Sequence, residues 1–242
     1  MADPTPPPAR PRRRRAARPA RRALTRERIA DAAMAILEAE GLDALSMRRV
    51  AQALDTGPAS LYAHVDDKDD LVSMLVDRAA GDIPLPEPDP QRWQEQVKDF
   101  VRALRATLAR HRNLARATMG HIPTGPNALA CTDWLLGLLR AAGLPPQVCA
   151  YAADLLPLYG GAVAFEEGLM DGALTPAELD AYVADVTAFF GHLPADRYPH
   201  VAALVPFLMR QEGDERFEFG LEVIVAGLAA QAGRDDPGPV QV

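Results

Sequence analysis

Apolar residues recur along most of this chain at intervals of three and four positions, the spacing of one face of an α-helix. The first such stretch begins at Thr25, a residue type that caps helix N-termini, and ends at Gly41, where glycine can close the last turn. Its apolar positions are Ile29, Ala32, Ala33, Ile36 and Leu37. No stretch alternates between apolar and polar residues as a strand would, so the pattern predicts an all-α protein.

Three short helices should follow the first. Ser46 can cap a second helix, and Pro58 suits the first turn of a third, where its missing N–H is not needed. A fourth helix is expected to start at Asp66 or Asp67, because negative charge is favourable at a helix N-terminus. Together these helices predict a small N-terminal domain over residues 24–82.

A proline-rich stretch separates this domain from the rest of the chain. Residues 83–90 carry four prolines at alternate positions, which excludes a helix and favours an extended, stiff connector. The Pro- and Arg-rich stretch 1–23 has too few large apolar residues to form a core, and residues 233–242 are rich in Gly, Pro and Asp. We therefore expect disordered tails at both ends and a larger C-terminal domain over residues 91–232.

The second domain shows helical periodicity except at residues 194–213, which we expect to be irregular. The segment Thr175-Pro176-Ala177-Glu178 has the residues of a capping box, with proline at the first helical position. Pro157 and the glycine pair 160–161 should interrupt the longest helix. The helices expected here start at Asp89 with Pro90 in the first turn, run near 113–119, over 127–142 before Gly143, over 146–170, from Thr175 to about His192, and from Asp214 to about Gln231.

Charge is distributed unevenly along the chain. Residues 1–22 hold eight arginines and one acid, whereas the remainder is acidic enough to bring the net charge of the chain to −7. A basic tail on an acidic body is expected when one end meets a polyanion, and a solubilising tail or a processed leader is the alternative.

Several classes of protein are disfavoured by what the sequence lacks. The two cysteines, Cys131 and Cys149, lie in apolar helical contexts, which favours buried thiols over a disulfide framework. No run of eighteen apolar residues and no apolar segment after the N-terminal arginines is present, so we expect neither a membrane span nor a secretory signal. The histidines have no metal-ligand spacing, and no catalytic constellation or phosphate loop stands out. We therefore expect a cytoplasmic protein with no metal, no cofactor and no enzymatic activity.

Residues 46–68 form the most informative stretch, because they predict two short helices joined by a tight turn. The second helix presents polar side chains outward while Leu61 and Val65 point inward. A short polar helix pinned by its neighbour suits insertion into the major groove of DNA. This stretch therefore predicts a helix-turn-helix.

The same stretch resembles the TetR family of bacterial transcription regulators, and in particular its tetracycline-repressor branch. The resemblance rests on Gly41 at the end of the first helix, on Leu-Ser-Met-Arg at 45–48, and on the string Leu-Tyr-x-His-Val-x-x-Lys at 61–68. Residues 216–222, Arg-Phe-Glu-Phe-Gly-Leu-Glu, are also similar to the second domain of that branch. The resemblance covers about residues 24–231 and implies a DNA-binding regulator.

Side chains of the motif have the chemistry that contacts with DNA need. Tyr62, His64 and Lys68 can donate hydrogen bonds to phosphate oxygens, as can the hydroxyl of Thr25. Arg48 can reach a phosphate or a guanine edge, and Ala59 and Ser60 are the best candidates for reading bases. Ser46 and Met47 are included because they belong to the Leu-Ser-Met-Arg string, although Met47 also fits the core. The predicted DNA-contacting residues are Thr25, Ser46, Met47, Arg48, Ala59, Ser60, Tyr62, His64 and Lys68.

The sequence departs from the branch at Gly57-Pro58, where the branch has an amide side chain that can read a base. More of the specificity is therefore expected to rest on Arg48 and Ser60. The acidic stretch 66–70 opposes phosphate contact, although a helix N-terminus offsets most of that cost. The arginine-rich tail could follow the minor groove or add only sequence-independent affinity.

The resemblance further implies a homodimer, in which residues 146–170 and 214–231 of two subunits form a four-helix bundle. The last helix agrees with this independently, since it has apolar residues on two faces. The residues expected in the dimer interface are Leu155, Leu156, Phe217, Leu221, Ile224 and Leu228.

A small-molecule cavity inside the second domain is also implied by the resemblance. Each candidate lining residue fits a plain core or surface position better than a ligand contact. The candidates are Phe100, Leu104, His111, Met119, His121, Trp134, Tyr151, Tyr159 and Phe165, with Glu166 or Glu167 as a polar anchor.

These features predict a repressor that a small-molecule ligand releases from palindromic double-stranded DNA. A regulator that activates, or that lacks an effector, is the nearest alternative. A helical enzyme with a vestigial DNA module is disfavoured because no catalytic constellation is present. A nucleoid-packaging protein is disfavoured by the acidic body.

Overall fold

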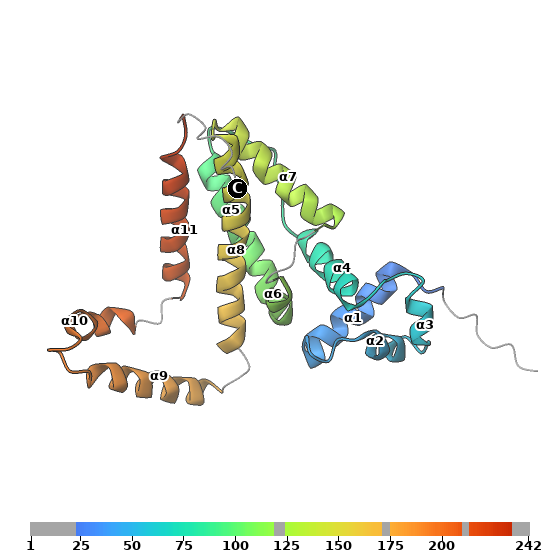
Figure 1. Cartoon of the computed structure of the whole chain (residues 1–242), viewed down its shortest axis with the longest axis horizontal. Helices are drawn as coiled ribbons and strands as arrows, with labels where there is room; N and C mark the ends of the chain where they lie inside the picture. Colours follow the sequence, from blue (N-terminus) through green and yellow to red (C-terminus); the bar gives the residue numbers. More distant parts are fainter. Residues whose placement is uncertain (1–22, 119–123, 171–174, 210–212, 234–242) are drawn as a thin grey trace, which may run out of the picture.

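The computed structural model describes residues 23–118, 124–170, 175–209 and 213–233. Within these ranges the regular secondary structure is helical throughout, as the periodicity predicts. Figure 1 shows an upright group of helices with a smaller helical unit on one side and a pair of helices projecting on the other.

The smaller unit contains four helices whose starting points follow from local capping. They are α1 (Arg26–Glu40), α2 (Met47–Ala53), α3 (Pro58–Leu61) and α4 (Lys68–Ala80). The side chains of Thr25, Ser46 and Asp67 accept hydrogen bonds from backbone N–H groups in the first turns of α1, α2 and α4. Gly41 has a φ of +85° after α1, which confirms its predicted role at that helix end.

The larger part of the molecule is a bundle built around α8. Its helices are α5 (Trp93–Arg110), α6 (Arg112–Thr118), α7 (Pro126–Ala141), α8 (Pro146–Met170) and α11 (Gly213–Ala229). The central helix α8 packs against α5, α6, α7 and α11. By length and composition α8 could cross a membrane over Pro146–Leu169, but here it is the central helix of the bundle.

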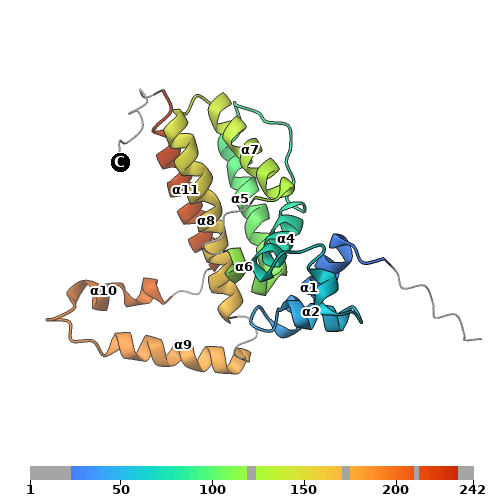
Figure 2. The same ribbon diagram turned by 45° about the vertical axis from the view of Figure 1, so that its right-hand side comes forward.

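Two helices, α9 (Pro176–Gly191) and α10 (Pro199–Leu208), pack mainly on each other and extend from the end of the bundle (Figure 2). The predicted capping box is present, since Thr175 and Glu178 bond each other's backbone N–H. Figure 1 draws this pair on the opposite side of the bundle from α1–α3. Large apolar side chains remain exposed on it: Tyr182, Phe189, Leu204, Phe207 and Leu208.

Three expectations about helices are corrected. Residues 194–213 were expected to be irregular, yet α10 forms there; its apolar residues lie on every side, so no helical stripe marks it. The helix expected from Asp89 begins at Trp93, because the Asp89 carboxylate accepts from the N–H of Gln91 at 2.9 Å and closes a turn instead. The helix α8 runs through Pro157 and the glycine pair without a break.

Two apolar clusters hold these elements together. One is centred on α1, α2 and α4 but is completed by Leu108, Leu114, Ala115 and Ala164 from the bundle. The other lies among α5, α7, α8 and α11. Leu104 on α5 packs against both clusters, so the smaller unit is joined to the bundle through shared side chains.

Candidate DNA-binding surface and ligand cavity

The segment after α2 presents a polar surface on a buried support. Leu61 and Val65 are buried in the cluster beneath, whereas Ala59 and Ser60 are exposed. Tyr62 keeps 55% of its side chain exposed. The helix α3 ends at Leu61, so Tyr62 and His64 lie in the turn that follows it and not on the helix that the sequence pattern predicts.

Hydrogen bonds fix this turn to neighbouring elements. The Arg26 guanidinium donates to the His64 carbonyl and, at 3.2 Å, to Asp70 Oδ1. Lys68 Nζ donates to the Leu42 carbonyl at 3.1 Å, which links the start of α4 to the segment between α1 and α2. The polar surface is therefore held from both sides, as a preformed binding surface requires.

Of the two adjacent arginines on α2, only Arg48 is available to a ligand. Arg49 pairs with Glu40, and the hydrogen bond from Arg49 lowers the pKa of the Glu40 carboxyl. Arg48 is exposed and makes no hydrogen bond or ion pair with any residue that the structure describes. Its guanidinium is therefore accessible on the surface of this unit.

The acidic stretch at the start of α4 is largely occupied with capping. Asp67 Oδ1 accepts from the Asp70 N–H at 2.9 Å, and Asp70 Oδ2 accepts from the Asp66 N–H at 3.0 Å. These carboxylates lie where the helix dipole is favourable to negative charge, which reduces their repulsion toward a phosphate backbone.

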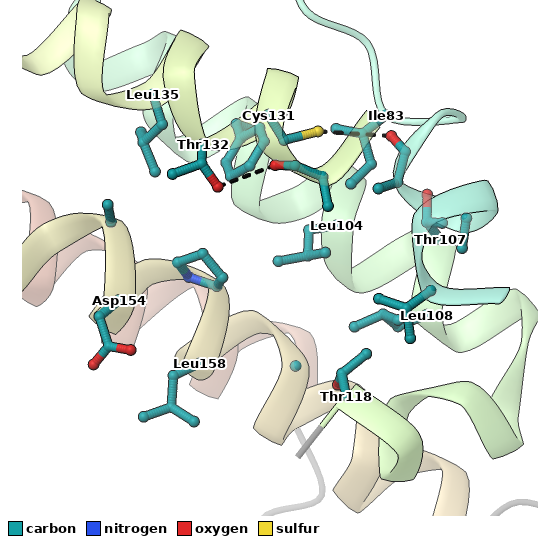
Figure 3. A pocket seen from close by; sticks show the side chains of 18 residues that line it. Ile83, Leu104, Thr107, Leu108, Thr118, Cys131, Thr132, Leu135, Asp154 and Leu158 are labelled. Carbon is teal, nitrogen blue, oxygen red and sulfur yellow. Dashed lines mark hydrogen bonds between the residues drawn. The ribbon is translucent and has the colours of Figure 1, made fainter. Parts of the chain in front are cut away.

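A cavity of about 450 Å³ lies between the end of α4 and the bundle, a size suited to a small organic ligand. Figure 3 shows Leu104 pointing into it from α5, with Thr132 on α7 and Leu158 on α8 around it. Its wall is mostly apolar, with Asp154 as the one charged side chain among the described lining residues. The lining residues include Val76, Ala79, Ala80, Ile83, Phe100, Leu104, Thr107, Leu108, Thr118, Ala128, Cys131, Thr132, Leu135, Asp154, Pro157 and Leu158.

The hydroxyl groups of three threonines in this cavity can each form a further hydrogen bond. Thr132 donates to the Ala128 carbonyl at 3.0 Å and Thr118 to the Ala115 carbonyl at 2.8 Å, so both oxygens remain acceptors. The Thr107 hydroxyl instead accepts from Arg110 at 3.2 Å, which leaves its O–H as a donor. Burial, followed by the nearby Asp77 carboxylate, raises the pKa of the Cys131 thiol and keeps it neutral.

Family comparisons match both parts of the chain. The description "Bacterial regulatory proteins, tetR family" applies to residues 29–75, and "Tetracyclin repressor-like, C-terminal domain" applies to residues 85–232. The chain belongs to the TetR family of transcriptional regulators.

Individual TetR-family proteins are similar along nearly the whole chain. An HTH-type transcriptional regulator of Saccharopolyspora erythraea is 31% identical over 87% of this chain and 86% of its own length. The HTH-type transcriptional repressor DrrR1 of Streptomyces coeruleorubidus is 32% identical over 89% of this chain and 81% of its own. The TetR family protein ActR of Streptomyces coelicolor, solved in complex with actinorhodin, is 42% identical with a TM-score of 0.81, over 87% of this chain and 98% of its own.

The predicted DNA-contacting residues of this TetR-family protein differ in how exposed their side chains are. Arg48, Ala59, Ser60, Tyr62 and Lys68 are exposed, and His64 is half-buried on the same surface. Thr25 and Ser46 are half-buried and use their hydroxyl oxygens as helix caps. Met47 is 8% exposed and belongs to the core, so its side chain is not placed to touch DNA.

The predicted ligand residues coincide with the cavity at only two positions, Phe100 and Leu104. Met119 and His121 lie outside the described residues. The other described candidates do not line the cavity, and all but the exposed Tyr151 form contacts elsewhere. His111 bonds Glu38, Trp134 donates to the Pro86 carbonyl, Tyr159 donates to the Phe217 carbonyl, Glu166 pairs with Arg216, Phe165 packs toward the N-terminal cluster and Tyr151 is exposed.

The sequence interpretation missed most of the cavity wall because that wall consists of small and aliphatic residues. Val76, Ala79 and Ala80 come from α4, which the sequence assigns to the DNA-binding domain alone. Thr107 and Thr132 carry no chemical signature that separates them from other helix positions. Among the described residues, no group of three or more His, Cys, Asp or Glu side chains could hold a metal ion.

The predicted dimer residues also divide by burial. Leu156, Phe217, Leu221 and Leu228 are at most 8% exposed and belong to the core of one protomer, and their place in a dimer interface stays a prediction. Leu155 is 43% exposed and Ile224 is half-buried. The apolar residues that α8 and α11 expose are Tyr151, Leu155, Leu158, Leu169, Phe219 and Val223.

Proposed function

We propose that this protein is a homodimeric repressor that leaves a palindromic DNA operator when a largely apolar, hydroxylated aromatic molecule fills the cavity. The observation that carries this proposal is the position of the cavity. Its wall joins the end of α4, which packs on the DNA-binding helices, to α5–α8 of the bundle. A ligand there would act on the element that leads to the DNA surface.

The DNA contacts are proposed from exposure and chemistry. Tyr62, His64 and Lys68 would donate to phosphates and fix the register, with Thr25 adding a contact at the start of α1. Arg48 and Ser60 would read base edges, and Ala59 would contact a thymine methyl group. One copy of this surface reads a short site, and a two-fold dimer extends it to a palindrome.

The dimer is proposed on the outward faces of α8 and α11. Phe219 and Val223 are 71% and 55% exposed on α11, and Leu155 is 43% exposed on α8. Large apolar side chains grouped on a surface mark an interaction site. A second copy of the chain would cover them in an isologous four-helix contact.

The ligand class is proposed from the cavity wall and from the relatives. An apolar wall suits aromatic rings, the Thr118 and Thr132 oxygens can accept from ligand hydroxyls, and Thr107 can donate to a ligand carbonyl. ActR, which is 42% identical, is known in complex with actinorhodin. Actinorhodin is therefore the first probe to use.

The proposed mechanism is a shift between two arrangements of α4. In the DNA-bound arrangement the cavity is small. The helix α4 then holds the DNA-binding surfaces of the two subunits at the spacing of the operator. A ligand that binds the expanded arrangement more tightly moves the population toward it and lowers operator affinity. We propose that this binding and release take place in the bacterial cytoplasm and that the protein catalyses no reaction.

The test begins with selection of genomic DNA fragments by the purified full chain, followed by footprinting. We expect one or a few protected palindromes, loss of protection in Arg48→Ala, and loss of protection on adding actinorhodin. Uniform protection without sequence preference would overturn the repressor proposal. Specific protection that neither actinorhodin nor a library of aromatic metabolites changes would favour the alternative of a regulator without an effector.

A further inference from the structure

The N-terminus of α7 is capped by a side chain from another helix. The Asp77 carboxylate on α4 accepts through Oδ1 from the N–H groups of Asn127, at 2.8 Å, and Ala128, at 3.0 Å. These are the donors that an N-cap side chain would satisfy, and the α7 N-cap, Gly125, has no side chain to do so. Pro126 at the first position has no N–H to satisfy.

Further contacts make this junction close and specific. Asn127 Nδ2 donates to both the Asp77 carbonyl and Asp77 Oδ2 at 3.2 Å. A Cβ atom at Gly125 would lie 2.2 Å from Asp77 Oδ1 and 2.5 Å from Asp77 Cβ. Only glycine at position 125 therefore lets the Asp77 carboxylate reach the end of α7.

The Asp77 junction lies directly beside the cavity wall. Val76, next to Asp77, and Ala128, next to Asn127, both line the cavity. One turn further on, Cys131 Sγ lies 3.6 Å from the Ala80 carbonyl and joins the same two helices again. A molecule in the cavity that moves α4 relative to α7 must therefore break this junction.

The other end of α4 leads to the DNA surface. The helix has 13 residues and spans about 20 Å at 1.5 Å per residue. Its first turn contains Asp70, which pairs with Arg26, and Lys68, which bonds Leu42. A rotation of α4 at Asp77 is therefore carried to the residues that support Tyr62 and His64.

A second route between the bundle and the DNA-binding unit passes through α1. Asn113 Nδ2 on α6 donates to the Leu37 carbonyl at 2.8 Å, and His111 bonds Glu38 at the same distance. These contacts meet the C-terminal part of α1 and involve no residue of the described cavity wall. They hold the unit in place without sensing the ligand.

We infer that Asp77 is the positioning residue that couples the cavity to the DNA surface, by fixing α4 to the N-terminus of α7. This inference rests on the proposed function, in which a ligand in the cavity lowers operator affinity. Asp77 itself is not among the residues that line the cavity.

The first test needs no ligand and measures amide hydrogen exchange in the full-length dimer. Asp77→Ala should raise exchange by about tenfold in residues 126–132, whose cap is removed, and also in residues 68–80, because α4 is no longer anchored. Asp82→Ala is the matched control: it removes the same charge five positions later, from an exposed pair with Arg110 at 3.8 Å, and should leave both segments unchanged. An increase confined to residues 126–132 would mean that Asp77 is only a cap and would overturn the inference.

The second test measures operator affinity with and without saturating actinorhodin. Asp77→Ala should bind actinorhodin within about twofold of wild type but lose most of the ligand-induced drop in operator affinity. Gly125→Ala, which drives the two helices apart from the other side, should show the same loss. A full ligand response in both variants would contradict the inference.

A fallback variant and the exchange measurement distinguish failure of the inference from failure of the proposed function. Where Asp77→Ala does not fold, Asp77→Asn keeps the Oδ1 acceptor without the charge, and the inference then predicts a reduced but measurable ligand response. Where actinorhodin leaves the wild type unaffected, the ligand part of the proposed function fails, while the exchange measurement still decides whether Asp77 anchors α4.

Discussion

At the scale of single residues, the proposed DNA-binding surface contains side chains suited to reading bases and side chains suited to contacting phosphates. The Ser60 and Arg48 side chains are exposed and form no hydrogen bond or ion pair with the part of the chain that the structure describes. Tyr62 and Lys68 lie next to them, and Lys68 is already held by the Leu42 carbonyl. Contacts to phosphate carry no sequence information, whereas contacts to base edges do.

Two substitutions test this division. Ser60→Ala should alter the preference at one operator position, whereas Tyr62→Phe should weaken binding to all sequences alike, by about tenfold or less for the removal of one hydrogen bond. Binding measured against a set of single-base operator variants distinguishes the two results. A change of sequence preference in Tyr62→Phe would contradict the assignment of Tyr62 to the backbone.

Residue roles could be predicted from sequence where the interaction is local. The caps at Thr25, Ser46 and Thr175 are confirmed, because a cap and its acceptors lie within three positions of each other. The partners of Trp134 and Tyr159 could not be predicted, since their hydrogen bonds join residues 48 and 58 positions apart. An aromatic side chain in a helix looks the same in sequence whether it lines a cavity or fastens two helices.

At the scale of elements, α11 is attached to α5 by a row of ion pairs. Arg102 forms a bidentate pair with Glu218 at 2.8 and 2.6 Å, and Arg105 pairs with Glu167 and Asp214 while lying 4.4 Å from the centre of the Phe217 ring. The hydrogen bonds from Arg102 lower the pKa of the Glu218 carboxyl. Because α11 also carries the proposed dimer face, this row positions that face.

The ion pair gives a pH-dependent prediction. A carboxyl whose pKa is lowered by folding stabilises the protein fully above its ordinary pKa near 4.5, and this contribution disappears as the pH falls through the lower folded value. Glu218→Gln should therefore reduce the free energy of unfolding at pH 7 by about 1 kcal/mol or less, since the pair is partly exposed. Urea unfolding at fixed protein concentration should show this difference at pH 7 and a smaller difference at a pH below 4.5. An equal difference at both pH values would exclude the ion pair as its cause.

Elements could be predicted where apolar residues follow a single stripe. This holds for α1, α4, α5 and α7, whose buried residues recur at three and four positions. It fails for α10, whose apolar residues lie on every side and which has no buried residue in one protomer. A helix that is apolar on every side leaves no one-sided stripe to detect.

At the scale of the whole molecule, apolar surface on α8, α11 and the α9–α10 pair remains uncovered in one copy. The burial pattern of α11 shows which of its two apolar faces packs in the core and which one faces outward. Phe217, Leu221 and Leu228 face the protomer's core, and Phe219 and Val223 face outward. The two faces were visible in the sequence, but their assignment depends on how α11 packs against α5 and α8.

Introducing charge on the outward face should therefore separate the subunits. Phe219→Glu is expected to weaken dimerisation by about a hundredfold or more, because it buries an unpaired charge in the proposed interface. Leu129→Glu on α7 is the control, since Leu129 is 53% exposed and lies outside that face. Sedimentation velocity over a range of concentrations measures both. An unchanged dimer in Phe219→Glu would move the interface elsewhere.

The basic N-terminal segment adds a prediction about salt. Residues 1–22 carry eight arginines and lie outside the described residues. Removing them should make operator affinity less sensitive to salt, since the slope of log K against log salt becomes shallower by about 0.9 for every phosphate that the protein no longer neutralises. Affinities measured from 50 to 300 mM salt, on the order of the physiological range, give the two slopes. Equal slopes would argue against any DNA role for this segment.

The central claim, that the cavity beside α4 controls DNA binding, is tested most directly by filling the cavity. Leu104 points into its middle, so Leu104→Trp should occupy the space that a ligand needs. Operator affinity is measured for wild type and Leu104→Trp with and without saturating actinorhodin. Actinorhodin should weaken wild-type binding by about tenfold or more, whereas Leu104→Trp should no longer bind actinorhodin and should show one affinity in both conditions. Wild-type affinity that stays constant with actinorhodin bound, or a Leu104→Trp variant that still responds to it, would contradict the account.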